Sequence, residues 1–268
     1  MEELLTVSGL SKTFHLSKKQ QKLEKTTEKV KVAVDDLSFC TYRGEVFGLL
    51  GPNGAGKTTM FNLITGIYHP TEGNLMLNEA SLVGKKTHET AAMGVARTFQ
   101  NIRLFGELSV YDNIITSCQK HLSYSLLDGI FRTGKFRREE KEIAAFSKEI
   151  LQELGLWELR NQVAGNLPYG QQRRLEIARA IVTEPTLLLL DEPAAGMNEE
   201  ESAKLSSVIK SIRAAYDVTI IVIDHHMDVI MDSCDQITVF NFGSKLAEGK
   251  PEEIQHNPAV IEAYLGGE

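Results

Sequence analysis

The sequence contains no hydrophobic run long enough to span a bilayer. Its longest apolar stretches are residues 187–190 and residues 218–223, the second interrupted by one Thr. Both have the length of a β-strand, far short of the roughly 20 residues that a transmembrane helix needs. The first five residues have neither a basic region nor a long apolar segment, so we expect no secretory signal. We therefore expect a chain that does not cross a membrane itself, which leaves open a position against one through a partner.

Cysteine and positive charge are also scarce. The three cysteines, Cys40, Cys118 and Cys234, lie far apart and form no C-x-x-C or Cys/His metal spacing. We interpret them as reduced thiols of a cytosolic protein. The formal net charge of −7 argues against sequence-independent binding of nucleic acid, because an acidic chain gains little from releasing phosphate counterions. We expect no nucleic-acid partner.

The most informative segment is Gly51-Pro52-Asn53-Gly54-Ala55-Gly56-Lys57-Thr58-Thr59, which matches G-x-x-x-x-G-K-[ST]. It follows the apolar residues 45–50 and leads into residues 60–64, which predicts the order strand, glycine loop, helix. Glycines let the backbone turn its N–H groups inward around an anion, and the helix N-terminus faces the same anion. In such a loop the Lys reaches the β- and γ-phosphates and the Thr hydroxyl binds Mg²⁺. The segment predicts binding of a nucleoside triphosphate.

Strand-like segments alternate with helical ones along much of the chain. This alternation predicts an α/β fold with a largely parallel sheet. Residues 186–190 and 218–223 are near-continuous apolar runs, which are typical of strands covered on both faces. Residues 238–241 and 245–248 predict a hairpin.

The two flanking regions have a different character. Within residues 1–45 we expect antiparallel strands near residues 4–7, 30–34 and 37–42, with a polar segment, residues 17–31, as a solvated hairpin tip or flexible loop. A role of that segment at a membrane surface or in partner binding is the alternative.

Residues 101–168 are predicted to be mostly helical. Ser109 is a good N-cap, and residues 135–142 lead into a long amphipathic helix that runs towards Gly155. Near the C-terminus, Asn257 is expected to cap a short helix over residues 259–265.

A second candidate site element is the pair Asp191-Glu192, at the end of the apolar run 186–190. We expect this strand to lie beside the strand that precedes the glycine loop. Asp191 can then hold the Mg²⁺ shell, and Glu192 can orient or deprotonate a water that attacks the γ-phosphate.

Just upstream lies Leu167-Pro168-Tyr169-Gly170-Gln171, followed by a helical segment that runs to Ala180. Together with the glycine loop, Gln100, Asp191-Glu192 and His225, this segment resembles the nucleotide-binding subunit of ABC transporters over essentially the whole chain. The resemblance implies a P-loop NTPase (RecA-like) α/β core with a mostly parallel sheet. It also implies an antiparallel β subdomain near residues 1–45 and 70–80, and an inserted helical subdomain near residues 101–168. Residues 1–268 would form a single ATP-binding domain.

The resemblance also assigns roles to individual residues. Glu192 is expected to be the catalytic base, His225 the switch histidine at the γ-phosphate, and Gln100 the residue that links the nucleotide to the helical subdomain. Mg²⁺ would be held by Thr58, Gln100 and, through water, Asp191. The nucleotide contacts would be Phe14 on the adenine, Val32 nearby, Gly51, Pro52, Asn53, Gly54, Ala55, Gly56, Lys57, Thr58 and Thr59, and, on the ATP of a partner subunit, Leu167, Pro168, Tyr169, Gly170 and Gln171.

Two segments depart from the family pattern. The signature Leu-Ser-Gly-Gly-Gln has Pro168 and Tyr169 here, and the loss of the Ser hydroxyl should weaken the contact with the partner's γ-phosphate by at most about 1.5–3 kcal/mol. The loop after Glu192 ends in Asn198, where the family usually has Asp. We hypothesise that the natural partner is a non-identical ATPase subunit with a stronger signature.

The same departures, with the terminal Glu262-Ala263-Tyr264-Leu265-Gly266 and residues 97–105, resemble the branched-chain amino acid uptake subgroup. The resemblance implies an ATPase with ATP and Mg²⁺ as cofactors, held on the cytoplasmic face of the inner membrane by integral permease subunits. Those subunits would contact the region of Gln100 and residues 101–110. An extracytoplasmic binding protein would deliver the amino acid.

Three alternatives stay open at this point. Relatives of the subgroup import urea or amides, or export lipopolysaccharide. Soluble ABC ATPases act on DNA or ribosomes, but they usually carry a coiled-coil insertion or two ATPase halves, and this chain has neither. A P-loop kinase or GTPase outside the ABC class would leave residues 167–180 unexplained.

Overall fold

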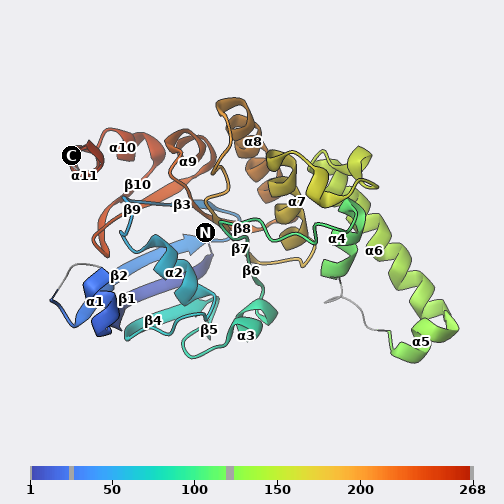
Figure 1. The fold of residues 1–268 in the computed structure, drawn as a ribbon, viewed down its shortest axis with the longest axis horizontal. Coiled ribbons are helices and arrows are strands. Elements are labelled where there is room, and N and C mark those ends of the chain that lie inside the picture. The colour runs from blue at the N-terminus through green and yellow to red at the C-terminus, as the bar shows by residue number, and fades with distance from the viewer. Residues whose placement is uncertain (1, 24–26, 119–123, 266–268) are drawn as a thin grey trace.

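Two β-sheets organise the chain, and helices cover them and extend from one end (Figure 1). The computed structural model describes residues 2–23, 27–118 and 124–265. The polar segment 17–31 is therefore described only in part, and Gly266 of the terminal motif lies outside the described residues. In chain order the elements are β1 (Glu3–His15), α1 (Lys18–Leu23), β2 (Val30–Tyr42), β3 (Val46–Leu50), α2 (Lys57–Ile64), β4 (Glu72–Leu77), β5 (Ala80–Ser81), α3 (Thr87–Ala92), β6 (Val95–Arg97), α4 (Val110–Ser117), α5 (Leu126–Phe131), α6 (Gly134–Glu153), the 3₁₀ turns Trp157–Leu159 and Ala164–Asn166, α7 (Tyr169–Ile181), β7 (Leu187–Asp191), α8 (Glu199–Tyr216), β8 (Thr219–Ile223), α9 (Met227–Ser233), β9 (Gln236–Asn241), β10 (Ser244–Gly249), α10 (Pro251–Gln255) and α11 (Pro258–Leu265).

The larger sheet has the order β10-β9-β3-β8-β7-β6, and every pair except β10–β9 is parallel. All residues of β3, β7 and β8 are buried, as the apolar runs predict. The expectation that β7 lies directly beside β3 is wrong, because β8 lies between them. This central place shields both faces and both edges of β8, the strand built from three Ile, one Val and one Thr. The ends of β3 and β7 still meet at one edge of the sheet.

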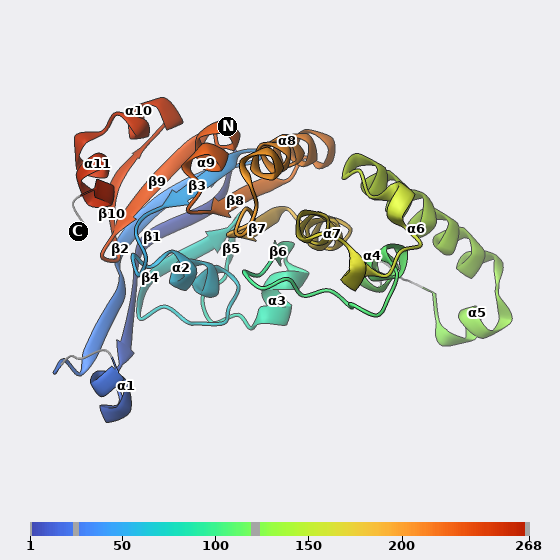
Figure 2. The same cartoon turned by 45° about the horizontal axis from the view of Figure 1, so that its top comes forward.

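The smaller sheet is antiparallel, with the order β2-β1-β4-β5. Its long β1–β2 hairpin pairs from Glu3 with Tyr42 to His15 with Val30 and contains several bulges. The two strands expected at residues 30–34 and 37–42 form one strand, interrupted only by Asp36, whose φ is 44°. At the hairpin tip the structure places helix α1, where the sequence predicted a polar tip or loop (Figure 2).

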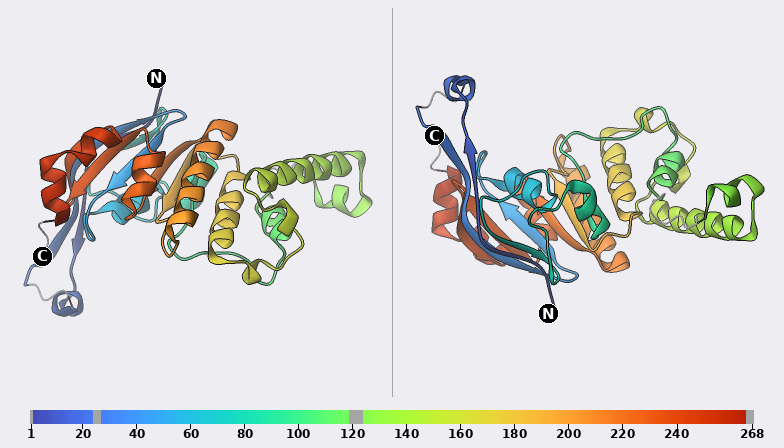
Figure 3. Two further views of the ribbon diagram at one scale, coloured as in Figure 1. Left: turned by 90° about the horizontal axis from the view of Figure 1, so that it is seen from above. Right: turned by 90° about the horizontal axis from the view of Figure 1, so that it is seen from below.

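Helices α4 to α7 form the other end of the molecule, and α6 extends outwards with α5 at its far end (Figures 1 and 3). The predicted caps are confirmed, since Ser109 accepts a hydrogen bond from Asp112 N and Asn257 accepts one from Ala259 N. One hydrophobic cluster joins Val110 of α4 and Ile150 of α6 to Leu188 of β7. The helical end is thus packed onto the sheet through α7. Among the residues that the structure describes, no helix is both long and apolar enough to cross a bilayer.

Candidate nucleotide site

The P-loop, residues 51–59, joins β3 to α2 and requires glycine at two of its bends. Gly51 and Gly56 have φ values of 149° and 103°. A Cβ on Gly51 would lie 2.3 Å from the Phe240 carbonyl oxygen, and a Cβ on Gly56 would lie 2.4 Å from that of Ala33. Helix α2 begins directly after Gly56 without a side-chain cap. The loop therefore offers the bare helix N-terminus that attracts phosphate.

Lys57 is buried on the first turn of α2. Its ammonium donates hydrogen bonds to the carbonyl oxygens of Gly51, at 2.5 Å, and Pro52, at 3.0 Å. Burial lowers the pKa of Lys57, and the nearby carboxylates of Glu192 and Asp191 oppose this shift. These carbonyl contacts hold the cation inside the loop, within reach of any phosphate that the loop takes up.

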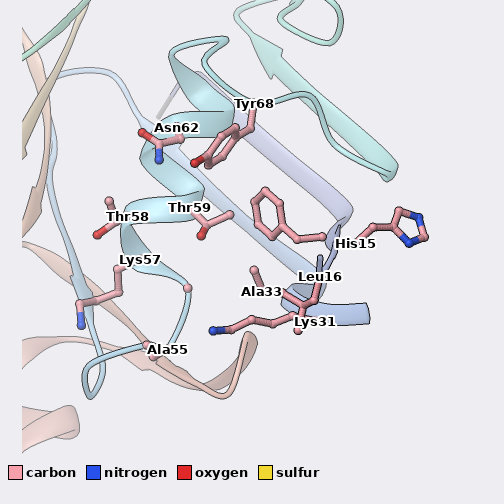
Figure 4. A pocket seen from close by; sticks show the side chains of 13 residues that line it. His15, Leu16, Lys31, Ala33, Ala55, Lys57, Thr58, Thr59, Asn62 and Tyr68 are labelled. Atoms are coloured by element: carbon pink, nitrogen blue, oxygen red, sulfur yellow. The ribbon is translucent and has the colours of Figure 1, made fainter. Parts of the chain in front are cut away.

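A cavity of about 450 Å³ opens beside the P-loop, against β1 and β2 (Figure 4). Phe14 lines it and packs edge-to-face on Tyr68, with 5.1 Å between the ring centroids. On β2 the lining residues are Lys31 and Ala33, whereas Val32 is 50 % exposed and not among them. Because successive side chains of a strand point to opposite faces, we take Lys31 and Ala33, in place of Val32, as the candidate contacts of β2 with the nucleotide.

Several residues of this cavity carried no signal in the sequence. His15 and Leu16 lie at its outer end, where the His15 ring points away from the other labelled side chains, and Asn62 lies one helical turn beyond Thr58 and Thr59 (Figure 4). Lys31 directs its side chain from β2 towards the side of the cavity where Ala55 lies. The cavity thus combines an aromatic wall with the N-terminus of a helix and two lysines, a set that suits a base at one end and phosphates at the other.

The three predicted catalytic side chains meet at the carboxyl edge of the larger sheet. Gln100 Nε2 donates to Glu192 Oε2 at 2.7 Å, and His225 Nε2 lies 3.0 Å from Glu192 Oε1. Glu192 has a φ of 48°, and its N–H donates to Ile223 O at 2.7 Å. A non-glycine residue in this left-handed region is costly and persists where the surroundings impose it.

The neighbouring residues explain why His225 and not His226 faces Glu192. Asp224 is buried, accepts a hydrogen bond from Ala194 N at 2.8 Å, and contacts His226 Nδ1 at 2.7 Å. His226 is therefore held by Asp224 on the other side of the chain. This leaves the His225 ring next to the Glu192 carboxylate.

Asp191 makes a buried ion pair that the sequence analysis missed. Arg97 donates to Asp191 Oδ2 at 2.7 Å and to Asn62 Oδ1 at 2.7 Å, and the side chains of Arg97 and Asp191 are only 7 % and 6 % exposed. The Arg97 guanidinium also lies 5.4 Å from the ring centroids of Phe61 and Phe99. Nothing in the spacing of residues 97–101 identifies Arg97 as the partner of a carboxylate 94 positions later.

The residues around this edge fit a hard divalent cation. Thr58 offers a hydroxyl. Arg97 binds Oδ2 of Asp191, so Oδ1 of the same carboxylate can face a cation. Gln100 donates to Glu192 through Nε2, which leaves its amide oxygen available. Oxygen donors of this kind, completed by phosphates and water, are what Mg²⁺ prefers. The described residues contain no group of three or more His, Cys, Asp or Glu suited to a metal, and a site of this composition needs none.

The signature residues lie away from the cavity beside the P-loop. Pro168 is the N-cap of α7, Leu167 is buried, and none of the residues from 167 to 171 lines that cavity. Tyr169 is 43 % exposed, and its hydroxyl accepts a hydrogen bond from Arg173 at 3.1 Å. Asn198 caps α8, accepting from Glu201 N at 2.9 Å, as an Asp would at this position.

Comparison with known proteins decides the family. The model of the ABC transporter family matches residues 34–195, and that of the branched-chain amino acid ATP-binding cassette transporter C-terminal segment matches residues 244–268. The chain belongs to the ABC transporter family. The cassette is 45 % identical over 235 residues to the high-affinity branched-chain amino acid transport ATP-binding proteins BraF of Pseudomonas aeruginosa and LivG of Escherichia coli, covering 88 % of this chain and 92 % of each relative. It is 32 % identical over 266 residues to the lipopolysaccharide export system ATP-binding protein LptB of Acidithiobacillus ferridurans, covering 99 % and 98 %.

Solved structures agree with this assignment and with the expected α/β fold. An ATP-binding cassette of an ABC transporter in its ADP conformation superposes with a TM-score of 0.80 at 27 % identity, covering 99 % of the cassette and 100 % of that chain. A nucleotide-free ATP-binding cassette from an ABC transporter gives a TM-score of 0.77 at 28 % identity, covering 98 % of both chains.

Two regions near the C-terminus contact the P-loop, one at its first residue and one at its middle. Gly51 N donates to the Tyr264 hydroxyl at 2.6 Å, from α11, and Gly243 N donates to Ala55 O at 3.1 Å, from the β9–β10 turn. The carbonyl oxygen of Gly243 also accepts a hydrogen bond from Asp35 N at 2.9 Å. Tyr264 was singled out in the sequence only as part of a terminal motif, and its contact with Gly51 joins residues that lie 213 positions apart.

Proposed function

We propose that this cassette is the ATP-binding and ATP-hydrolysing subunit of a transporter that imports branched-chain amino acids. The observation that carries the proposal is the Glu192 carboxylate, held between Gln100 and His225 at 2.7 and 3.0 Å, at the same sheet edge as the P-loop. The family membership and the C-terminal match at residues 244–268 support the transport role.

In the proposed site the triphosphate lies on the P-loop and the N-terminus of α2. Lys57 exchanges its two carbonyl partners for β- and γ-phosphate oxygens, and Phe14 takes the adenine face. Thr58, Gln100 and, through water, Asp191 would hold Mg²⁺, which would supply positive charge against the phosphates.

Glu192 is proposed as the general base that accepts a proton from the attacking water. His225 contacts the γ-phosphate and orients the carboxylate, with which it already shares a 3.0 Å contact. Gln100 positions the same carboxylate from the segment that follows β6. Loss of the γ-phosphate removes the proposed contact between His225 and the nucleotide.

A complete site is proposed to need a second ATPase subunit. Residues 167–171 do not line the cavity of their own chain, so in the proposed head-to-tail pair they contact the ATP of the partner. Because Pro168 and Tyr169 replace the usual Ser and Gly, we propose a non-identical partner. Turnover of this subunit alone, compared with turnover in the presence of a co-expressed second subunit, tests this: equal rates would remove the reason to propose a heterodimer.

The permease is proposed to dock in a groove between the sheet core and the helical end. This groove, about 560 Å³ in volume, has Phe99, Arg103 and Phe105 on one side and Thr87 and Arg179 on the others. It overlaps the predicted contact region of residues 101–110. Docking there would hold the cassette on the cytoplasmic face of the inner membrane, opposite an extracytoplasmic binding protein. We also propose that residues 1–268 act as one ATP-binding domain, with residues 101–168 as its helical subdomain.

Two measurements test the proposal in sequence. Calorimetric titration with Mg-ATP should register binding for the unmodified chain and none for Lys57→Ala, and retained micromolar affinity in that variant would refute the phosphate role of the P-loop. Vesicles reconstituted with the cognate permeases should then take up leucine, isoleucine and valine on addition of ATP. Uptake of urea in their place, or export of lipopolysaccharide as the 32 % identical relative suggests, would replace the substrate class but keep the ATPase.

A further inference from the structure

Helix α5 (Leu126–Phe131) presents three large apolar side chains to solvent at the far end of α6. Leu127, Ile130 and Phe131 are 65 %, 72 % and 75 % exposed. Their spacing of three and four residues places them on one face of the helix. Clustered exposure of this kind, unlike single exposed apolar residues, marks an interaction surface.

The corner that carries this face is held in place by polar contacts. The Asp128 carboxylate accepts hydrogen bonds from Ser125 N at 2.9 Å, Ser125 Oγ at 2.8 Å and Thr133 Oγ1 at 2.9 Å, and these bonds lower the pKa of Asp128. Tyr124 packs edge-to-face on Phe136 with 5.0 Å between ring centroids. The turn between α5 and α6 is therefore a defined structure with its polar groups satisfied, and the apolar face is left outside it.

The same corner is basic, whereas the rest of the chain is acidic. Residues 127–138 contain Arg132, Lys135, Arg137 and Arg138 against Asp128, a net charge of +3. Two acids follow directly, and they accept hydrogen bonds from Tyr124, Glu139 from its N–H at 3.3 Å and Glu140 from its hydroxyl at 2.9 Å. The whole chain carries −7, so the other 256 residues carry −10. An exposed apolar face flanked by Lys and Arg is the pattern of helices that lie in a membrane interface and meet anionic headgroups.

The position of the corner agrees with such a contact. Figures 1 and 2 show α5 on the same side of the molecule as α3 and α4, which supply residues to the proposed permease groove, and the view from below in Figure 3 shows these helices together. A permease seated in that groove would place its bilayer on this side. This step depends on the proposed function.

We propose that the α5 corner, residues 124–138, contacts the anionic headgroup layer of the membrane that holds the permease. Leu127, Ile130 and Phe131 enter the interface, and the four basic side chains lie at the level of the lipid phosphates. The contact adds a lipid anchor at the far end of α6 to the protein contact in the groove.

Sedimentation of the full chain with vesicles tests the proposal. Binding should be at least about tenfold stronger to phosphatidylcholine vesicles with about a third phosphatidylglycerol than to pure phosphatidylcholine, and should weaken as salt rises. Arg132→Gln with Arg137→Gln should lower binding to the anionic vesicles about tenfold, whereas the matched control Lys18→Gln with Lys19→Gln, on α1, should leave it unchanged.

The apolar contribution is tested in the same way. Ile130→Gln with Phe131→Gln should abolish binding to anionic vesicles, and Val83→Gln with Ile261→Gln, which replaces two exposed apolar residues elsewhere, should not. ATP turnover of every variant should equal that of the unmodified chain, which also shows that each variant is folded.

Intact turnover without any vesicle binding by the unmodified chain overturns the proposal and leaves the ATPase function standing. If the unmodified chain does not bind lipid vesicles, cross-linking of the corner to a permease subunit in vesicles reconstituted with the permeases would assign the apolar face to a protein contact. Vesicle binding without ATP turnover, even in the presence of a co-expressed second subunit, would overturn the proposed function instead.

Discussion

Replacing Tyr264 by Phe tests whether the C-terminal segment supports the P-loop. The hydroxyl of Tyr264 accepts the hydrogen bond of Gly51 N at 2.6 Å, and burial raises the pKa of Tyr264, so the group stays neutral at physiological pH. The substitution removes one oxygen atom and keeps the ring that packs against the main hydrophobic cluster.

The expected loss follows from what happens to the Gly51 N–H. A Cβ at Gly51 would already collide with Phe240 O, so the peptide has little room to turn towards another acceptor. A donor left unpaired in a partly buried place costs about 1–3 kcal/mol. For a domain of this size that corresponds to a fall in melting temperature of about 2–4 °C for each kcal/mol. The carbonyl of Gly51 holds Lys57, so part of the loss should reach the phosphate site.

The assay is thermal unfolding of the full chain with and without Mg-ATP, together with ATP titration. Tyr264→Phe should melt lower than the unmodified chain and bind ATP up to about tenfold more weakly, with kcat at saturating ATP nearly unchanged. Tyr216→Phe is the matched control, because Tyr216 packs against Phe146 and makes no contact with the P-loop. Equal melting temperatures and ATP affinities for Tyr264→Phe and the unmodified chain would show that the contact with Gly51 has no role.

Three further predictions concern other parts of the cassette. Glu192→Gln should keep ATP affinity but lower the rate of phosphate release about 10²–10⁴-fold, and an unchanged rate would end the role of Glu192 as base. Arg97→Met leaves the buried Asp191 carboxylate without its cation and should lower the free energy of unfolding, measured in urea, by about 3–5 kcal/mol. The double variant Arg97→Met with Asp191→Asn should recover part of the lost stability. A double variant as unstable as the single one would contradict the ion-pair argument. Burial raises the pKa of Glu45 above 4.5, so its contribution to stability is fully present below about pH 4.5 and is lost as pH rises through the folded-state pKa. We therefore expect Glu45→Gln to flatten the decline in the free energy of unfolding above about pH 4.5, measured by urea unfolding at a series of pH values. An unaltered dependence of stability on pH would count against this role of Glu45.

The sequence was informative where a site residue sits in a local pattern. The P-loop, Asp191-Glu192 and His225 each follow an apolar strand directly, and the carboxyl ends of parallel strands meet at one edge. The order of those strands could not be predicted from the sequence, because β3, β7 and β8 are equally apolar and no local feature indicates which strand lies in the centre of the sheet. The face of β2 that lines the cavity was also hidden, because β1 and β2 shift register between Lys12 and Thr13. Alternation along the strand then places Val32 on the face opposite to that of Lys31 and Ala33.

Long-range partners of buried polar side chains could not be read from the sequence. Arg97 meets Asp191, and Tyr264 meets Gly51, only through tertiary structure, and an arginine in a helix or strand is most often exposed. Arg173 has one local partner, Glu176, but its bonds to Phe99 O and Gln100 O are long-range. The polar tip at residues 17–31 shows the converse, because a composition rich in Lys and Gln suits both a loop and the short exposed helix α1 that forms there.

The Tyr169 departure has a structural meaning within a single subunit. Arg173 is fully buried and donates to Phe99 O at 2.6 Å, to Gln100 O at 2.8 Å and to the Tyr169 hydroxyl at 3.1 Å. A glycine at position 169 could not make the last bond. Arg173 is also paired with Glu176 of α7 at 2.7 Å, so a movement of the Gln100 backbone must either carry Arg173 and the start of α7 with it or break the hydrogen bond between this buried guanidinium and Gln100 O. Tyr169 therefore adds, through Arg173, a link between the start of α7, where the contact with a partner's ATP is proposed, and the backbone of the Gln100–Glu192 pair.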